Sequence, residues 1–384
     1  MCARYLVLGG AGDMGGAVVK DLYLSNVDEV VIADLNKDAA DKLASELRNA
    51  GSSSTKISVI KLDINDERAL IDAAKDSDIV INTVGPFYKY EKIVIGALMK
   101  VERDYVDIND DYDATLEILK LSDAIRSSGS RVLIGMGWTP GITNVCARAG
   151  YEYLDETDEI NIAWVGSAAD ARGLAVILHT FHAVTGNVPM YLDGELTYVP
   201  ALQSKMTVEF PEPIGKVDVY YTGHPEPITI PRFLKGVRNV TIRGGLVPDW
   251  QNTLLRQLAI IGLTEDKEVD VHGVKISARE FLAHFVHQTY EQFRSGGVEA
   301  SGFWVEVKGK RNGVLTIVRY SGADRMYKLT GWSASIGAQY LVRNRSSISP
   351  GLYAPEGVIE PTWFINELKR RGIRVRREVI IVED

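Results

Sequence analysis

The first third of the chain alternates short apolar runs with longer segments of helical spacing. The apolar runs predict buried β-strands at residues 4–8, 29–33, 56–61, 78–82, 104–107 and 131–134. Between them, apolar residues recur every three or four positions, which predicts helices at residues 17–24, 37–49, 67–75, 91–100 and 114–127. Strands separated by such helices indicate right-handed βαβ crossovers and a parallel sheet. Six of them predict a doubly wound Rossmann domain of the α/β class.

Beyond about residue 150 the pattern changes. Strand-like runs joined by turns rich in glycine and proline occur at residues 159–165, 205–210, 217–221, 226–230, 240–242, 301–307 and 314–320. Helical spacing interrupts them at residues 173–185, 250–261 and 278–293, and returns in the tail at 331–342 and 361–371. Residues 373–383 read as an edge strand protected by charge. The middle of the chain therefore predicts a second domain of the α+β class with a mixed or antiparallel sheet.

A glycine-rich turn joins the first predicted strand to the first helix. Gly10, Gly12 and Gly15 fill the three glycine positions of G-x-G-x-x-G. In dinucleotide-binding folds these glycines allow a tight turn, a close approach of pyrophosphate to the backbone, and close packing of helix on strand. Asp13 and Met14 lie at the start of that helix, whose partial positive charge favours phosphate. A purely structural turn is the alternative, because glycine-rich turns are common.

The second predicted strand ends in Asp34, about 20 residues further on, where the dinucleotide fingerprint has an acid. Its carboxylate would accept hydrogen bonds from ribose hydroxyls and repel a 2′-phosphate, which favours NAD over NADP. Asn36 and Lys37 follow and could soften that preference. The alternative is that Asp34 caps the helix that starts near Lys37.

Ligands of doubly wound sheets bind at the carboxyl ends of the strands, which selects further candidates. They are Asp63 after the third strand, Asn82, Val84, Gly85 and Pro86 after the fourth, Asp107 after the fifth, and Trp138 and Thr139 after the sixth. We expect Asp63 near adenine and the segment from Asn82 to Pro86 near the nicotinamide ribose. Alternatively, Asp63 caps the next helix and Gly85–Pro86 forms a plain turn.

Composition narrows the partners. Of the 384 residues 46% are hydrophobic and 24% charged, which predicts a packed globular protein of two domains. The net charge of −8 argues against nucleic acid or an anionic membrane as the main partner. No apolar run is long enough for a membrane span, and no signal peptide is expected. The two cysteines lie far apart, which suits a cytoplasmic protein, and the six histidines form no zinc-binding pattern, so no metal is expected.

Several segments, taken in chain order, resemble the saccharopine dehydrogenase-like oxidoreductases, which include saccharopine reductases, lysine 6-dehydrogenases and carboxynorspermidine dehydrogenases. They are residues 9–15 (GGAGDMG), 82–87 (NTVGPF), 104–107 (DYVD), 137–144 (GWTPGITN) and 354–357 (APEG). The resemblance implies that the C-terminal segment folds back, so that residues 1–145 plus 331–384 form the Rossmann domain. Residues 146–330 would then be an inserted domain that binds substrate and forms a homodimer.

The same resemblance implies an NAD(P)-dependent enzyme that oxidises a carbon–nitrogen bond of an amino-acid-derived small molecule, or runs the reverse reaction, as in lysine metabolism. Two alternatives stay open: a non-catalytic dinucleotide-binding sensor or scaffold, and a reductase of a non-amine carbonyl substrate. NADP is the less favoured cofactor.

The chemistry requires a group that accepts a proton and cations that hold substrate carboxylates. His179 and His182 lie three apart on one helix face, and either could relay a proton. Asp107 and Tyr88 are further catalytic candidates, and Arg172 and Arg243 are candidates for binding substrate. Each has a structural alternative: a core or surface histidine, a structural acid, or a surface phenol. His224 lies in a Gly/Pro-rich segment that is more typical of a plain turn.

Overall fold

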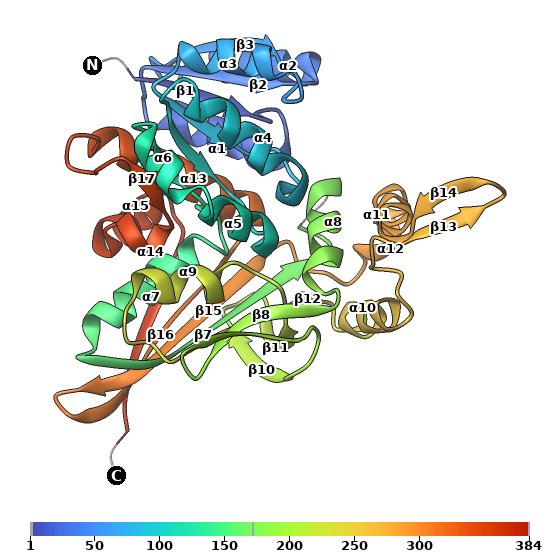
Figure 1. The fold of residues 1–384 in the computed structure, drawn as a ribbon, viewed down its shortest axis with the longest axis vertical. Helices are drawn as coiled ribbons and strands as arrows, with labels where there is room; N and C mark the ends of the chain where they lie inside the picture. Colours follow the sequence, from blue (N-terminus) through green and yellow to red (C-terminus); the bar gives the residue numbers. More distant parts are fainter. Residues whose placement is uncertain (1–2, 171–172, 383–384) are drawn as a thin grey trace. The chain divides into compact units, whose positions relative to one another are not determined.

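The computed structural model describes residues 3–170 and 173–382, and the chain divides into two compact units. The first unit holds the residues up to Ile142 together with Tyr327–Ile359. The second holds Thr143–Met326 and the residues from Glu360 onward. Figure 1 labels most of the helices and strands of both units.

The first unit is built on a seven-stranded parallel sheet in the order β17-β6-β5-β4-β1-β2-β3. Its strands are β1 (Arg4–Leu8), β2 (Glu29–Asp34), β3 (Lys56–Lys61), β4 (Ile79–Asn82), β5 (Asp104–Asp107), β6 (Arg131–Leu133) and β17 (Gly351–Tyr353). The order 3-2-1-4-5-6 of the first six strands is that of a doubly wound dinucleotide fold, so the predicted fold class is confirmed. The seventh strand comes from the C-terminal part of the chain and pairs in parallel with β6.

Helices cover both faces of this sheet. They are α1 (Asp13–Leu24), α2 (Lys37–Ala50), α3 (Glu67–Lys75), α4 (Phe87–Met99), α5 (Tyr112–Leu119), α6 (Ser122–Ser127), α13 (Met326–Arg343) and α14 (Pro355–Val358). Leu6 and Val80 point to the face that α3 and α4 cover, where they share a core with Leu70 and Val94. Helix α13 packs so tightly on α1 that a Cβ added at Gly331 would come within 2.6 Å of Ala17 Cβ.

The second unit is built on a mixed nine-stranded sheet. Its path is β10-β11-β12-β7-β15-β16-β18, and the hairpin β8–β9 joins it through β12. The strands are β7 (Glu156–Ser167), β8 (Asn187–Leu192), β9 (Glu195–Pro200), β10 (Met206–Phe210), β11 (Gly215–Tyr221), β12 (Asn239–Val247), β15 (Ser301–Arg311), β16 (Val314–Asp324) and β18 (Arg376–Ile381). Strands β12 and β7 pair in parallel, whereas β15 pairs antiparallel with both β7 and β16.

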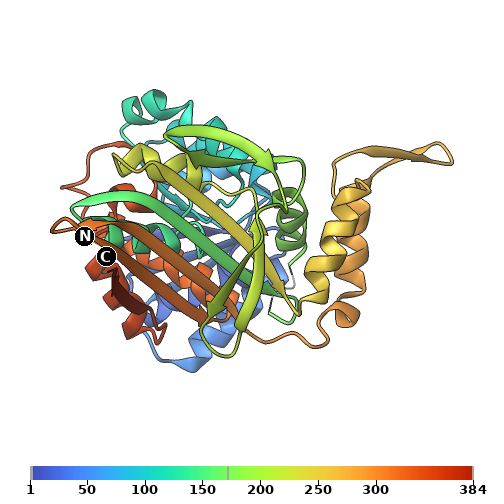
Figure 2. The ribbon, with the colours of Figure 1, turned by 90° about the horizontal axis from the view of Figure 1, so that it is seen from below.

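Helices accompany this sheet, and a separate hairpin stands apart from it within the unit. The helices are α7 (Ile142–Tyr153), α8 (Leu174–Ala183), α9 (Glu226–Phe233), α10 (Trp250–Ile260), α11 (Ala278–Gln288), α12 (Tyr290–Phe293) and α15 (Pro361–Arg370). The hairpin of β13 (Glu268–Val271) and β14 (Val274–Ser277) extends beyond α11 (Figure 2). Helices α8, α10 and α11 share a small core that includes Leu178, Leu255 and Leu282.

The structure differs from the sequence-based expectation in several elements. The sequence pattern did not predict α7, β8, β9, β13 or β14, and two further differences concern residues 226–230 and the tail. Residues 226–230 were expected as a strand but form α9, because Pro225 and Pro227 stand at its first turn, where the missing N–H of proline costs no helical hydrogen bond. The tail also divides. Strand β17 joins the first unit, whereas β18 pairs with β16 at the edge of the second sheet, so the assignment of all of 331–384 to the Rossmann domain is wrong.

Candidate functional site

The turn between β1 and α1 has the geometry of a phosphate cradle. Gly9 adopts φ +70°, and Gly15 packs so closely that a Cβ would come 2.1 Å from the Gly9 carbonyl oxygen. Gly12 is exposed, and a Cβ there would meet only that oxygen, at 3.4 Å. Gly12 is also the N-cap of α1 and offers no side chain to the first N–H groups of the helix, which leaves them to an anion. The turn therefore fits a pyrophosphate.

The loop after β4 lies directly against this turn. A Cβ on Gly9 would come within 3.0 Å of Val84 Cγ2 and 3.1 Å of Thr83 Oγ1. The Thr83 hydroxyl donates to the Leu8 carbonyl at 2.7 Å, which ties the two strand ends together. The backbone N–H of Val84 donates to Asn82 Oδ1 at 3.0 Å, which fixes the loop that leads into Gly85 and Pro86.

Asp34 links the end of β2 to the glycine turn. Its Oδ2 accepts from the backbone N–H of Ala11 at 2.9 Å, and its Oδ1 accepts from Asn36 N–H at 2.9 Å. Asn36 is the N-cap of α2, so the alternative in which Asp34 caps that helix is wrong. The partly exposed carboxylate retains lone pairs for ribose hydroxyls.

A buried network of polar side chains lies beneath the ends of β4 and β5. The Tyr105 hydroxyl donates to Glu91 Oε1 at 3.0 Å, and Asn82 Nδ2 donates to the same hydroxyl at 3.0 Å. Asp107 is fully buried, and its Oδ1 accepts from the N–H groups of Asn109 at 2.9 Å and Gly135 at 2.6 Å. Burial raises the pKa of Asp107, although hydrogen bonds from Glu91 and the two N–H groups oppose that rise.

In the second unit, His179 of α8 meets a buried histidine from the segment before α9. The Nε2 atoms of His179 and His224 lie 3.3 Å apart, and His224 Nδ1 lies 3.7 Å from Glu226 Oε2. Glu226 Oε1 accepts from the Thr143 hydroxyl at 3.2 Å, and the Trp164 ring lies 5.4 Å from that of His224. Burial, followed by the neighbouring His179, lowers the pKa of His224 well below its usual value, so its ring is held neutral. We call His179, His224 and Glu226 the histidine chain.

Two family models match consecutive parts of this chain. The saccharopine dehydrogenase NADP binding domain matches residues 5–133, and the saccharopine dehydrogenase C-terminal domain matches residues 137–373. The chain belongs to the saccharopine dehydrogenase family. It is therefore an NAD(P)-dependent dehydrogenase of the class that acts on a carbon–nitrogen bond.

Individual saccharopine dehydrogenase relatives are distant. The apo saccharopine dehydrogenase (L-Glu forming) of Saccharomyces cerevisiae has the same fold, with a TM-score of 0.71 over 98% of this chain and 100% of that one, at 16% identity. A carboxyaminopropylagmatine dehydrogenase of Synechocystis sp. is 21% identical over 95% of both chains. A lipid droplet localized protein of Caenorhabditis elegans is 31% identical over 35% of this chain and 34% of its own length. No helix in the described part of the chain has the length and apolar character that crossing a bilayer requires.

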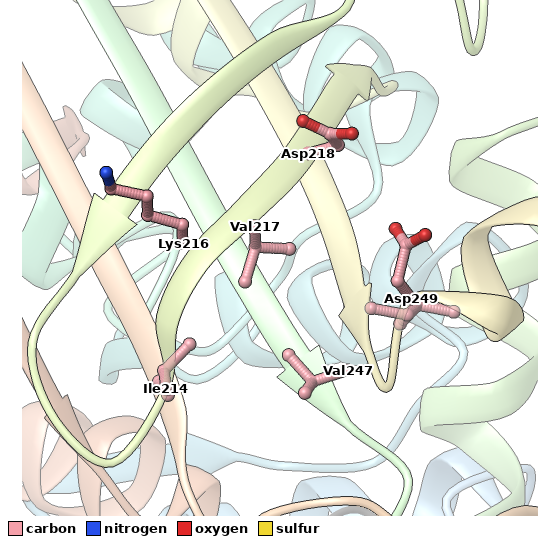
Figure 3. A pocket seen from close by; sticks show the side chains of 7 residues that line it. Ile214, Lys216, Val217, Asp218, Val247 and Asp249 are labelled. Atoms are coloured by element: carbon pink, nitrogen blue, oxygen red, sulfur yellow. The ribbon is translucent and has the colours of Figure 1, made fainter.

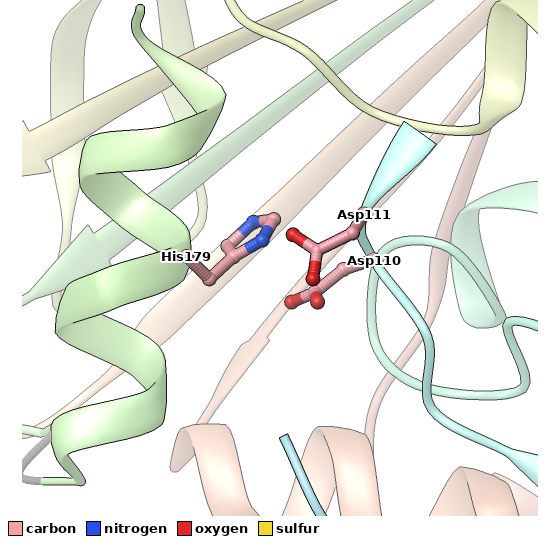
Figure 4. Close-up of side chains that lie close together, drawn as sticks. All are labelled: Asp110, Asp111 and His179. Atoms are coloured by element: carbon pink, nitrogen blue, oxygen red, sulfur yellow. The ribbon is translucent and has the colours of Figure 1, made fainter. Parts of the chain in front are cut away.

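The remaining candidates in the nucleotide-binding unit of this family member have local partners. Asp63 lies in an exposed turn where its Oδ1 accepts from Asn65, and α3 is capped by Asp66, so the alternative that Asp63 is the cap is wrong. The backbone N–H of Tyr88 donates to Asp111 Oδ2 at 3.0 Å. Figure 4 shows Asp110 and Asp111 in the loop before α5, and His179 on α8. Trp138 and Thr139 are buried in the loop after β6.

Arg243 does not fit its expected role as a substrate-binding cation. Its Nε donates to the Ser204 carbonyl and its Nη2 to the Ser204 hydroxyl, both at 3.0 Å. Its Nη1 donates to the Thr241 hydroxyl at 2.8 Å, and the guanidinium lies 4.4 Å from the centre of the Tyr221 ring. The side chain is buried and its donors are directed at the protein, so the structure contradicts that role. Arg172 lies outside the described residues.

The two histidines of α8 have different partners. His179 meets His224, whereas His182 Nδ1 lies 3.2 Å from an Arg279 guanidinium nitrogen. Their shared helix face therefore does not make them interchangeable.

The second unit also has a shallow pocket on its sheet. Its volume is about 180 Å³, and Lys216, Asp218 and Asp249 contribute charges to its lining (Figure 3). Ligand sites typically measure roughly 300–1,000 Å³, so this pocket is small for an amino-acid conjugate.

Sequence reasoning missed Glu91, Tyr105, Glu226 and the role of His224. One signal was present: Glu91 interrupts the buried stripe of α4, four residues after Phe87 and three before Val94. A lone acid at a core position of a helix needs a buried polar partner. His224 had no such signal, because the segment that follows it was read as a strand.

Proposed function

We propose that the chain is an NAD-linked dehydrogenase that oxidises a carbon–nitrogen bond of an amino-acid-derived amine, or runs the reverse reductive condensation. The observation that carries this proposal is the union of a glycine turn that fits pyrophosphate with an acid, Asp34, hydrogen-bonded to that turn. Nicotinamide, when bound, accepts or donates the hydride. The similarity to a carboxyaminopropylagmatine dehydrogenase and to a saccharopine dehydrogenase supports an amine substrate of this class.

The preference for NAD follows from the groups around Asp34. Its carboxylate would accept from the ribose hydroxyls and repel a 2′-phosphate. Lys37, the nearest cation along the chain, is paired with Asp41 at 2.6 Å, and Asn36 Oδ1 accepts from Ala39. Neither side chain is therefore prepared to hold a 2′-phosphate. The matching family model carries the NADP name, so both cofactors belong in the assay.

The histidine chain is proposed to accept the proton that the substrate amine loses. An amine must be neutral when hydride leaves its carbon, so a base has to take up that proton. An unprotonated imidazole at His179 can accept that proton through one ring nitrogen, while His224 stays neutral. Glu226, next to His224, would stabilise the resulting positive charge. Asp107 is fully buried among its own partners, so it is the weaker candidate for this base.

The assay follows formation of reduced cofactor at 340 nm with NAD or NADP and a panel of saccharopine, lysine and aminopropylagmatine-type amines. We expect turnover on at least one amine, with NAD favoured. Binding of cofactor without turnover on any amine would instead identify a sensor, and turnover only on a carbonyl lacking nitrogen would identify a different reductase.

The cofactor preference has its own test. Asp34→Ala should weaken NAD binding by about 1–3 kcal/mol, because two ribose hydrogen bonds are lost, and should narrow the preference over NADP. Fluorescence titration with NADH and NADPH measures both affinities. Asp38→Ala, on the exposed first turn of α2, is the control and should change neither. Unchanged NADH affinity in Asp34→Ala would remove the role given to this residue.

The proposal includes a homodimer formed by the second unit. The hairpin β13–β14 places Val269 opposite Ile276 and Val271 opposite Val274, so one of its faces is wholly apolar. Val269, Val271 and Val274 are 47%, 46% and 60% exposed, and a two-stranded hairpin is only marginally stable alone. Light scattering should find a dimer, and a variant with Val271→Asp and Val274→Asp should be monomeric, whereas Lys275→Ala on the charged face should not. A monomeric wild type would refute this part.

A cytoplasmic location is also proposed. Cys146 is buried and its burial raises the pKa of its thiol, so it is held in the unreactive protonated form. Two cysteines in 384 residues suit a reducing compartment. Cell fractionation tests the location.

A further inference from the structure

Glu91 is a buried carboxyl group, and within residues 3–170 and 173–382 no ion pair to it is found. It lies in the core-facing stripe of α4 and is 1% exposed. The groups that act most strongly on it are Asp107, Tyr105 and Asn82. A buried carboxylate without a positive partner is costly, so a residue placed here without a role would be expected to be apolar.

Glu91 and Asp107 form a pair of buried carboxyl groups. Burial, followed by the charge of Asp107, raises the pKa of Glu91 well above its usual range, and the hydrogen bonds from Tyr105 and Asn82 offset only part of that rise. Two buried carboxyl groups side by side cannot both ionise cheaply, which favours the form in which one of them is protonated. The protonated carboxyl can donate to its partner, which no carboxylate could do.

The network reaches three loops at the carboxyl edge of the sheet. Through Asn82 it meets the N–H of Val84, in the loop after β4. Through Asp107 it meets the N–H of Asn109, after β5, and the N–H of Gly135, after β6. These are the loops at which ligands of a doubly wound sheet bind.

We propose that Glu91 is a positioning residue of the nucleotide-binding unit, which bridges Asn82, Tyr105 and Asp107 and thereby holds the loops after β4, β5 and β6 in the arrangement that receives the nicotinamide half of the cofactor. The inference rests on the proposed function for the identity of the ligand. The coupling of the three loops is a property of the first unit alone and is independent of the proposed function.

The test compares two substitutions at one position. Glu91→Leu removes every polar contact of the bridge, whereas Glu91→Gln keeps an acceptor for Tyr105 and an N–H donor for Asp107. We expect Glu91→Leu to weaken NADH binding by about 10- to 100-fold, as misplaced loops do, and Glu91→Gln to restore affinity to near the wild-type value. Glu67→Gln is the matched control, because Glu67 is an exposed carboxylate paired with Lys100 and should leave binding unchanged.

Hydrogen exchange of the Val84, Asn109 and Gly135 amides reads the loops directly and needs no cofactor. Faster exchange at all three in folded Glu91→Leu, with protection restored in Glu91→Gln, supports the bridge even if the chain binds no NADH, in which case only the proposed function fails. If Glu91→Leu does not fold, Glu91→Gln still decides, because a bridge requires near-wild-type exchange and affinity in that variant. Unchanged exchange and affinity in a folded Glu91→Leu, or loss of both in Glu91→Gln, would overturn the proposal.

Discussion

The two units of this protein each bury a cluster of ionisable side chains. The first cluster consists mainly of acidic groups, the second mainly of basic ones, and in both burial makes the charged form costly. The first unit buries two carboxyl groups, Glu91 and Asp107, beside a phenol, and the pKa of Glu91 is raised. The second buries two imidazoles and one carboxyl group, and the pKa of His224 is lowered. Desolvation drives both shifts toward the neutral form, because burial penalises charge of either sign.

The difference shows what each cluster can do. A carboxyl pair that accepts hydrogen bonds from a phenol and from backbone N–H groups is suited to holding loops. An imidazole such as His179, in contact with a second imidazole that is held neutral, can accept a proton from a substrate. We therefore assign positioning to the first cluster and proton transfer to the second, and the predictions below test that division.

The largest expected effect is on turnover and comes from the histidine chain. His224→Gln should lower kcat by up to about 10²- to 10⁴-fold, the usual contribution of proton transfer, because the proton-accepting His179 loses its neutral neighbour; NADH affinity should change little. Stopped-flow absorbance and fluorescence titration measure the two quantities. His272→Gln, at the exposed hairpin tip, is the control. If His224→Gln instead lost cofactor affinity at full kcat, the division between the clusters would be reversed.

How far the sequence anticipated these clusters follows from their positions. The alternation of strand and helix signals predicted six strands of the first sheet, and with them the carboxyl-end positions of Asn82 and Asp107. It could not show that Glu91, nine residues beyond Asn82, turns inward to meet both, because a contact between a helix and two strands has no periodic signature.

In the second unit the prediction failed for a related reason. The β-branched residues Ile228, Thr229 and Ile230 made 226–230 look like a strand, whereas Pro225 and Pro227 suit the first turn of the helix that forms. Pairing of His224 with His179 joins positions 45 residues apart, which no local pattern encodes. The strand β18 was foreseen as an edge strand, but the sheet that it borders was not.

The smallest expected effect is on stability, and its sign should differ between the clusters. A raised pKa at Glu91 means that the folded state ionises later than the unfolded state, so this group loses stabilising free energy as pH rises from its ordinary value toward its raised one. A lowered pKa at His224 means that the unfolded state binds a proton at this side chain more readily than the folded state. The folded state therefore loses stability as pH falls below the ordinary histidine pKa of about 6.5. Each group can contribute a slope of at most about 1.4 kcal/mol per pH unit.

Urea denaturation of the wild type, Glu91→Gln and His224→Gln between about pH 5 and 9 measures these slopes. Relative to the wild type, Glu91→Gln should gain stability progressively toward alkaline pH, because it removes the group that ionises at a cost. His224→Gln should gain stability relative to the wild type toward acid pH. In the wild type, the unfolded state binds a proton at His224 that the folded state does not, and the substitution removes this loss of stability. Parallel curves for all three proteins would mean that neither side chain is titrated differently by folding. Slopes of the same sign would mean that one cluster carries a counter-charge, and the contrast between a carboxyl bridge and an imidazole chain would no longer explain why each unit buries what it does.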